Sequence, residues 1–563
     1  MLDELKNLEK EADAEVRAFE ILKLPARGVL AGLHYLVFVG RHGHALNGQS
    51  EPGIGEAIIG RLGHALFLLK DLPCTPYGAS AQDAVEAFLE TDPGQDQLKK
   101  ILAYLHFSEH MPEVHRGYWR VSGQDGDLEL SYRDDVFADG QARDITLSEL
   151  AIPFSFQTPI EAEIWAMAKT APKIDRPSVA KLIAEGARRY SLAMAEPDVI
   201  TSKGIQRIFG FDLDRFLSIR AVVLAYAEFC DKMGFAIHSE VMKGNADEAR
   251  LAEGLEWVSV NHKADFLFDF VAAASGASAA EVERFVDHYS VDYRQSPARY
   301  AGGDGFFPPF ARFKEGLLFS PSLVLTFLSI RNAVFAFSKA NQRAFDNFVS
   351  RDLEPVLLRQ AGELLRRGGD WIVREDIAFP GGQIDLLIAS PADGDVLLVQ
   401  AKGTLPPQGA RLTERLASRI REGVGQVQKF EALPAEVQAE VLANVLKRPV
   451  DRAGIRHAIL ARACFGAVEV LADGYPYAAI TLPLLSLALE RHRSEDRPCA
   501  IGELLQTLRE TTAECYARSE YRWEFGTLEV SGTKLRLPLL RWNQDGLGRL
   551  RREWWEASYR PVT

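Results

Sequence analysis

The sequence predicts a mixed fold, in which a large, mainly α-helical N-terminal region with a small β-hairpin precedes a C-terminal α/β domain. Three observations predict it. Apolar residues recur at three- and four-residue spacing from residue 1 to about 340, which is the period of an amphipathic helix. Two alternating segments within residues 117–132 flank a Gly/Asp-rich turn, as in a hairpin. From Asp370 onwards, leucine-rich and β-branched runs separated by glycine and proline indicate strands.

The composition excludes several classes of protein. The chain has 563 residues, 47% hydrophobic and 25% charged, which is enough for about three or four globular domains and unlike a disordered or collagen-like protein. The formal net charge is −13, yet residues 401–563 carry 24 basic and 20 acidic side chains and are slightly positive. We therefore expect any site for a polyanion such as DNA in the C-terminal part.

Cysteine usage and hydropathy favour a cytoplasmic protein. The five cysteines contain no C-x-x-C pair, so neither a disulfide framework nor a thiolate zinc site is predicted. The first residues are charged throughout and lack the apolar core of a signal peptide. The longest apolar run, at 316–330, has 15 residues and contains Pro321, so it is shorter than the ~20 residues that a bilayer requires.

Four segments are expected along the chain. Residues 1–150 form a mainly helical subdomain with the hairpin, and residues 151–340 form a helical region with a regulatory or recognition role. Residues 341–490 form the α/β domain, and residues 491–563 add a hairpin and a helix. The pattern S/T-x-x-E before apolar runs predicts helix starts at Thr146, Thr158 and Ser278, because the hydroxyl can accept hydrogen bonds from first-turn amides.

The α/β domain has a definite order of elements. A helix precedes three strands, which are WIVREDIAF, QIDLLIAS and VLLVQAK. A helix at about 411–433 follows, and then strands at 458–464 and 477–482. This order predicts a central mixed sheet flanked by helices.

Three polar side chains interrupt the second and third of these strands. Asp385 is the one carboxylate in an apolar run, a placement that is costly unless it is paired. Gln400 and Lys402 are two residues apart and therefore point to the same face of the sheet. If the PADGD turn makes these strands a hairpin, the three groups converge at one end. Such a set suits a hard cation such as Mg²⁺ and metal-assisted hydrolysis of a phosphodiester.

These residues carry a resemblance to a known family. The order helix, strand, G-x-I-D strand, turn, (E/Q)-x-K strand and helix resembles the PD-(D/E)xK nuclease superfamily. GGQIDLLIAS with LLVQAKG is similar to its Mrr-like branch, where glutamine also occupies the E position. The resemblance covers residues 345–485, about a quarter of the chain. It implies a restriction-endonuclease-like fold, DNA as substrate and Mg²⁺ as cofactor, with Mn²⁺ as a substitute.

The resemblance also implies the roles of individual residues. Asp385 is expected as a metal ligand, Gln400 as a ligand through its side-chain oxygen, and Lys402 as the catalytic lysine. Relatives often add a glutamate from the preceding helix, for which Glu354 is the best-placed candidate and Glu363 the second.

The helix after the lysine strand carries further candidates. Gln426 to Phe430 resembles a Q-x-x-x-Y motif with phenylalanine in place of tyrosine. The i, i+4 spacing places both residues on one helix face. The same helix carries a candidate phosphate-contacting set: Arg411, Arg415, Arg419, Arg421 and Lys429.

Gln400 is the main departure from the family pattern. An amide in place of a carboxylate removes a full negative charge, worth about 1 kcal/mol at ~4 Å in water and ~4 kcal/mol at an effective dielectric constant of 20. We therefore expect cleavage to need millimolar Mg²⁺ or to proceed better with Mn²⁺.

The predicted function is that of an endonuclease acting in restriction or antiviral defence, with a homo-oligomer as one form. One alternative is a degenerate nuclease fold that only binds nucleic acid or protein. Another is an effector that a protein or small molecule activates through the N-terminal region.

Individual residues also have structural explanations. Taken singly, Asp385 could cap a turn and Lys402 could be a solvated strand end. His106 and His110 share a helix face, where packed histidines are favoured over a zinc site. Trp542, Trp554 and Trp555 are favoured as packing rather than base-stacking residues.

Overall fold

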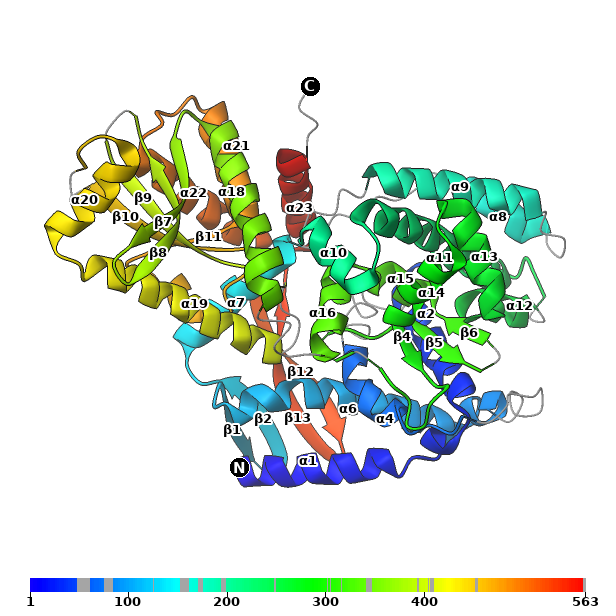
Figure 1. The fold of residues 1–563 in the computed structure, drawn as a ribbon. Helices are drawn as coiled ribbons and strands as arrows, with labels where there is room; N and C mark the ends of the chain where they lie inside the picture. Colours follow the sequence, from blue (N-terminus) through cyan, green and yellow to red (C-terminus); the bar gives the residue numbers. More distant parts are fainter. Residues whose placement is uncertain are drawn as a thin grey trace.

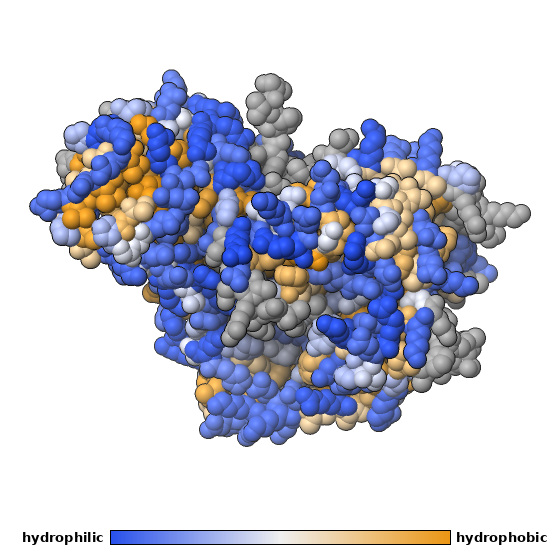
Figure 2. Space-filling view, in the orientation of Figure 1, coloured by the Kyte–Doolittle hydropathy of each residue, from blue (hydrophilic) through white to orange (hydrophobic). Residues whose placement is uncertain are grey.

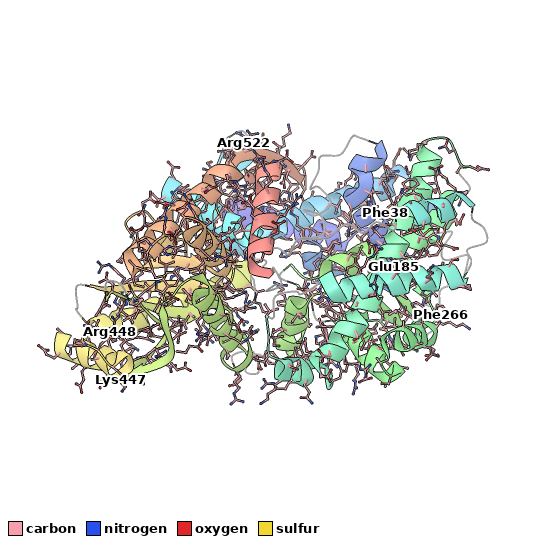
Figure 3. The ribbon with its side chains drawn as sticks, turned by 90° about the horizontal axis from the view of Figure 1, so that it is seen from above. Phe38, Glu185, Phe266, Lys447, Arg448 and Arg522 are labelled. Atoms are coloured by element: carbon pink, nitrogen blue, oxygen red, sulfur yellow. The ribbon has the colours of Figure 1, made fainter. Side chains whose placement is uncertain are left out.

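The computed structural model describes residues 1–47, 61–74, 85–124, 126–151, 161–170, 176–193, 199–247, 250–300, 302–303, 305–314, 316–340, 347–391, 394–403, 405, 410–450 and 454–559. Two lobes stand on a common base (Figure 1). We call them the helical lobe, made mainly of residues 161–340, and the α/β lobe, made of residues 347–519. Seen from above, the lobes lie side by side, with Lys447 and Arg448 at the end of the α/β lobe far from the helical lobe (Figure 3).

The α/β lobe is built on a five-stranded mixed sheet in the order β11-β10-β9-β8-β7. Its strands are β7 (Ile372–Phe379), β8 (Gly382–Ala389), β9 (Val396–Lys402), β10 (Ile455–Ala461) and β11 (Ala478–Thr481). β8 pairs antiparallel with both β7 and β9, whereas β9, β10 and β11 are parallel. The predicted order of elements in this region is confirmed. The finer assignment to a nuclease fold remains a proposal.

Helices cover both faces of this sheet. α18 (Glu354–Gly368), α21 (Leu482–Ser494) and α22 (Ile501–Ser519) pack on the face that carries Leu397 and Val399. α19 (Ala410–Glu431) and α20 (Ala435–Leu446) pack on the face that carries Leu398. β9 is therefore buried along its whole length. Figure 2 shows hydrophobic side chains gathered over this lobe on a surface that is otherwise mainly hydrophilic on the face drawn.

The base joins the two ends of the chain. The predicted hairpin is present as β1 (Trp119–Gln124) and β2 (Asp127–Tyr132), and the C-terminal hairpin as β12 (Arg522–Val530) and β13 (Thr533–Arg541). β2 and β13 pair in parallel, with Leu128 opposite Leu535, so the two hairpins form one sheet. The remaining base elements are α1 (Leu2–Arg17), η1 (Glu20–Lys23), η2 (Leu62–Ala65), α4 (Leu66–Leu69), α6 (Asp92–His115) and α7 (Asp135–Leu150). The last helix, α23 (Gln544–Tyr559), lies between the two lobes and packs on α21 and α22 (Figure 1).

The C-terminal tryptophans pack as expected where they are described. The Trp542 indole N–H donates to the Thr146 hydroxyl at 3.1 Å, and Trp554 is buried. The Trp523 ring lies 4.9 Å from that of Tyr132, between the two hairpins. The side chain of Trp555 lies outside the described residues.

The helical lobe surrounds α11 (Leu213–Met242), the central buried helix. Its other helices are α2 (Ala26–Asn47), α8 (Glu161–Thr170), α9 (Arg176–Ala193), α10 (Ser202–Phe209), α12 (Arg250–Val258), α13 (Ala264–Ser275), α14 (Ala279–His288), α15 (Pro321–Phe327) and α16 (Ile330–Ala340). A four-stranded sheet was not predicted here: β3 (Val260–His262), β4 (Ser290–Asp292), β5 (Phe310–Phe313) and β6 (Gly316–Phe319). Strands of three or four residues are too short to display a periodicity.

The predicted helix starts have different outcomes. Ser278 and Glu281 form a capping box at the start of α14, which confirms that prediction. The prediction at Thr146 is wrong, because Thr146 lies inside α7 and its hydroxyl donates to the Ala142 carbonyl at 2.7 Å. The N-cap of α7 is Asp134, which accepts from the Phe137 amide at 2.7 Å. Thr158 lies outside the described residues.

The apolar run at 316–330 is divided between β6, α15 and the start of α16. Within the described ranges, no single helix has the length and apolar character needed to cross a membrane. The pair Pro321–Phe327 and Ile330–Ser338 meets that test jointly, but it is bent by 84° and most of its residues are buried in the helical lobe.

Candidate active site

The candidate site lies where β8 and β9 separate. Their ladder ends at Leu386 opposite Val399, one step before Asp385 and Gln400. Beyond that step the Asp385 side chain, rather than the main chain of β8, accepts the hydrogen bond of a β9 amide. Its Oδ2 accepts from the Ala401 amide at 2.8 Å and from the Gln400 side-chain amide at 2.5 Å. The side chain therefore fills the space between the diverging strands.

The three sequence-predicted residues share one sheet face. Gln400 and Lys402 alternate with Ala401, which packs in the core of the opposite face. The Lys402 ammonium donates to Gln426 Oε1 at 2.8 Å. Gln426 belongs to α19, so this helix adds a fourth polar side chain to the three from the sheet. Gln400 and Lys402 are only 3% and 6% exposed, and both side chains are therefore buried. Phe430, one turn beyond Gln426, is buried with its ring 5.3 Å from that of Phe379.

A glycine of α19 makes this approach possible. A Cβ at Gly423 would lie 3.0 Å from Lys402 Cε and 3.5 Å from Gln400 Cγ. Sequence reasoning missed this role, because a glycine in a helix signals close packing only once its neighbour is known.

Glu354 reaches the same end of the sheet from the first turn of α18. Its carboxylate accepts from the Gly403 amide, and a Cβ at Gly403 would lie 2.8 Å from Glu354 Cγ. Burial raises the pKa of Glu354, while the Lys402 ammonium opposes that rise. Glu363, the second candidate, is not at the site: it pairs with Arg359 at 3.1 Å on an exposed face, nine residues or about 13 Å along the helix.

The electrostatics of Asp385 reflect its position. Burial raises its pKa to about 6, and the Lys402 ammonium and the Ala401 amide act in the opposite direction. The carboxylates of Glu354 and Asp376 raise the pKa further. Asp376 was not singled out from the sequence. It is exposed, with φ of 58°, and interrupts the β7–β8 ladder directly opposite Asp385.

The donor set fits an oxygen-preferring cation. Asp385 and Glu354 provide carboxylates, and Gln400 provides an amide whose oxygen and nitrogen exchange places by rotation of the terminal torsion. Across the described part of the chain, no group of three or more His, Cys, Asp and Glu side chains is arranged to hold a metal. The candidate set contains only two carboxylates and depends on Gln400 for its third donor.

Ion pairing offsets much of the positive charge of α19. Arg421 lies 2.7 Å from Glu469, and Arg419 lies 3.5 Å from Glu422. The Tyr118 hydroxyl from the base donates to Glu414 at 2.5 Å and ties the helix to the N-terminal region. The side chain of Arg411 lies outside the described residues.

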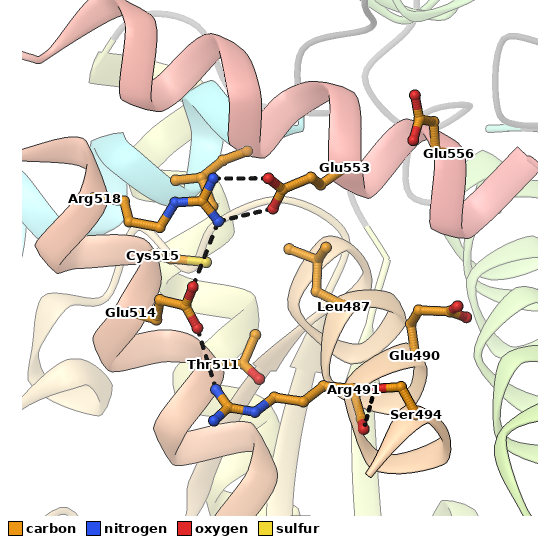
Figure 4. Close-up of a pocket in the computed structure, with 11 residues that line it drawn as sticks. Leu487, Glu490, Arg491, Ser494, Thr511, Glu514, Cys515, Arg518, Glu553 and Glu556 are labelled. Carbon is orange, nitrogen blue, oxygen red and sulfur yellow. Dashed lines mark hydrogen bonds and ion pairs between the residues drawn. The ribbon is translucent and has the colours of Figure 1, made fainter.

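Two cavities lie away from this site. One of about 300 Å³ lies between α21, α22 and α23, where Arg491 and Arg518 pair with Glu514 and Arg518 also pairs with Glu553 (Figure 4). These ion pairs connect the three helices. The other, of about 250 Å³, lies beside His106 in the base. The rings of His106 and His110 are 5.4 Å apart, and burial lowers the pKa of both.

Comparisons of this chain with protein-family models, curated proteins and solved structures found no match.

Proposed function

We propose that the chain is a metal-dependent nuclease that hydrolyses DNA phosphodiester bonds. The observation that carries the proposal is the meeting of Asp385, Gln400 and Lys402 on one sheet face, at the point where β8 and β9 separate. Each residue alone has an ordinary structural explanation. Their convergence with Glu354 and Gln426, from two different helices, does not follow from packing alone.

Each residue has a role in this proposal. Asp385, Glu354 and Gln400 would hold Mg²⁺, or Mn²⁺ in its place. The cation would supply positive charge that polarises the phosphodiester and favours ionisation of water. Lys402 Nζ offsets the negative charge that develops on the phosphate, in a buried environment where such an interaction is strong. Gln426 Oε1 accepts from Nζ at 2.8 Å and fixes the direction of the ammonium.

A plasmid-nicking assay tests the proposal. We expect the wild-type protein to nick DNA at millimolar Mg²⁺ or Mn²⁺, and Asp385→Ala and Lys402→Ala to lose at least about 100-fold in rate. Lys534→Met, at an exposed position of β13, serves as the control and is expected to retain activity. Equal behaviour of all four proteins would contradict the proposal. DNA binding without cutting would favour the alternative of a degenerate, binding-only nuclease fold.

The proposed setting is cytoplasmic defence against foreign DNA, supported by the resemblance to the Mrr-like branch. The helical lobe is proposed as the regulatory or recognition part, and a homo-oligomer as one working form.

A further inference from the structure

The two lobes meet at Asp352, two residues before Glu354. Asp352 is 1% exposed and belongs to a π-helical turn, Val349–Leu353, that leads directly into α18. A π-turn is uncommon and frequently marks a functional position, because it displaces the residues that follow it. Here the residue that follows it is the carboxylate donor of the candidate site.

The donors to Asp352 come from both ends of α10 in the helical lobe: Thr201 is the N-cap of this helix and Arg207 lies in its last turn. The Thr201 hydroxyl donates to Asp352 Oδ1 at 2.5 Å, and the Arg207 guanidinium donates to Oδ2. The Thr201 amide also donates to the Asp352 carbonyl at 3.2 Å. The side chain and the main-chain carbonyl of Asp352 are thus both held by one short helix of the opposite lobe. In Figure 1, α10 and the lower end of α18 face each other near the middle of the molecule.

Thr201 has two functions at once. Its hydroxyl oxygen accepts from the Gly204 amide at 3.1 Å and so caps α10, while its hydrogen is directed to Asp352. A Cβ at Gly204 would lie 2.4 Å from Ile200 Cγ1 and 3.2 Å from Asp352 Oδ1, so the glycine leaves room for both side chains. The first turn of α10 is therefore shaped around Asp352.

We infer that Asp352 is a positioning residue, through which the helical lobe holds Glu354 at Gly403 and thereby sets the cation affinity of the candidate site. The inference rests on the proposed function. The path has three steps: α10 fixes Asp352, the π-turn fixes the first residue of α18, and that residue meets Gly403 at the end of β9. The helical lobe, for which the sequence predicts a regulatory or recognition role, thus contacts Asp352, two residues before a proposed ligand, without contributing a ligand itself.

Direct measurement of Mn²⁺ binding by the full-length protein tests this inference independently of DNA cleavage. Asp352→Asn places an amide N–H against Arg207, and Thr201→Val removes the hydroxyl while keeping the shape of the side chain. We expect both variants to bind Mn²⁺ about tenfold more weakly, as outer partners of a metal site typically do. Thr201→Ser keeps the hydroxyl and is expected to bind as the wild type does. Glu440→Gln, at an exposed site of α20, is the charge-matched control.

The outcomes separate the inference from the proposed function. If the wild type binds Mn²⁺ and Asp385→Ala does not, while Asp352→Asn and Thr201→Val bind as the wild type does, the inference is overturned and the nuclease proposal stands. If Thr201→Ser is as weak as Thr201→Val, the hydroxyl is not the determinant and the inference also fails. If the wild type binds no Mn²⁺, both are overturned. Circular dichroism identifies any variant that does not fold, and the remaining variant then decides.

Discussion

At the scale of single residues, the proposed site has an amide, Gln400, where the family pattern that it resembles has a carboxylate. The Gln400 N–H group donates to Asp385 at 2.5 Å, so the buried carboxylate has a neutral partner rather than a like charge beside it. The Ala401 amide and Lys402 offset part of the cost of burying the Asp385 charge, although burial still raises the pKa of this carboxyl to about 6. The same arrangement weakens attraction for a cation, because one negative charge is missing.

Gln400→Glu should lower the stability of the cation-free protein and raise its affinity for a cation. A second carboxylate beside Asp385 adds like-charge repulsion in a buried site, so the melting temperature in EDTA should fall. The added charge should strengthen Mg²⁺ binding at least about fivefold, since a unit charge at ~4 Å is worth about 1 to 4 kcal/mol and about 1.4 kcal/mol corresponds to a factor of ten. A titration of the melting temperature with Mg²⁺ measures both effects, with Gln95→Glu on the exposed face of α6 as the control. An unchanged Mg²⁺ dependence would argue against Gln400 as a cation ligand.

Sequence reasoning could identify residues whose neighbours lie in the same or the next strand. Asp385, Gln400 and Lys402 belong to this class, since strand alternation and one hairpin suffice to bring them together. Asp352, Gly403 and Gly423 do not, because their roles depend on how α10, α18 and α19 dock. Glu363 was a wrong candidate for the same reason: the docking of α18 decides which of its turns reaches β9.

At the scale of elements, α19 covers the sheet face that carries the candidate site. It places Gln426 on Lys402 and Phe430 in the core below, and its glycine at 423 allows both contacts. The long strands and helices of the α/β lobe were predictable because each presents several periods of its pattern. The three- and four-residue strands β3 to β6 were not, since pairing partners rather than periodicity define them.

Two glycine substitutions in α19 separate helix stability from site geometry. A Cβ at Gly425 would have no neighbouring atom within 4 Å, so Gly425→Ala should stabilise the protein by about 1 kcal/mol through helix propensity. Gly423→Ala gains the same propensity but brings its Cβ to 3.0 Å from Lys402 Cε. We expect it to slow nicking at least tenfold, by displacing the ammonium, without a matching loss of melting temperature. Equal nicking rates for the two variants would show that the close packing of α19 does not matter.

At the scale of the whole molecule, N-terminal segments contact both the C-terminal hairpin and the α/β lobe. β2 pairs with β13 across about 400 residues of chain, and the buried Asp144 of α7 accepts from the Phe465 and Gly466 amides, each at 2.7 Å. Gly466 follows β10, the strand beside β9. Contacts between such distant segments leave no trace in a local sequence pattern, and only the presence of the two hairpins was predictable.

The stability that Asp144 contributes to the folded protein should depend on pH. Burial raises its pKa from 3.8 to about 6, so the folded protein binds a proton that the unfolded chain releases. Its contribution to stability is therefore full below about pH 4 and is lost as the pH rises through about 6. Asp144→Ala should lower the melting temperature, and by more at pH 4 than at pH 7.5. Asp135→Ala on the same helix is the control. An equal loss of melting temperature in Asp144→Ala at both pH values would contradict the raised pKa of Asp144.

The proposed function requires that the groups around Asp385 hold a divalent cation. The most direct measurement is a crystal structure of the protein soaked in Mn²⁺, with anomalous differences recorded at the manganese edge. We expect one strong peak bounded by the oxygens of Asp385, Gln400 and Glu354, with the Gln400 amide turned so that its oxygen faces the ion. Absence of a peak at saturating Mn²⁺, with the Gln400 N–H group still directed at Asp385, would contradict the account.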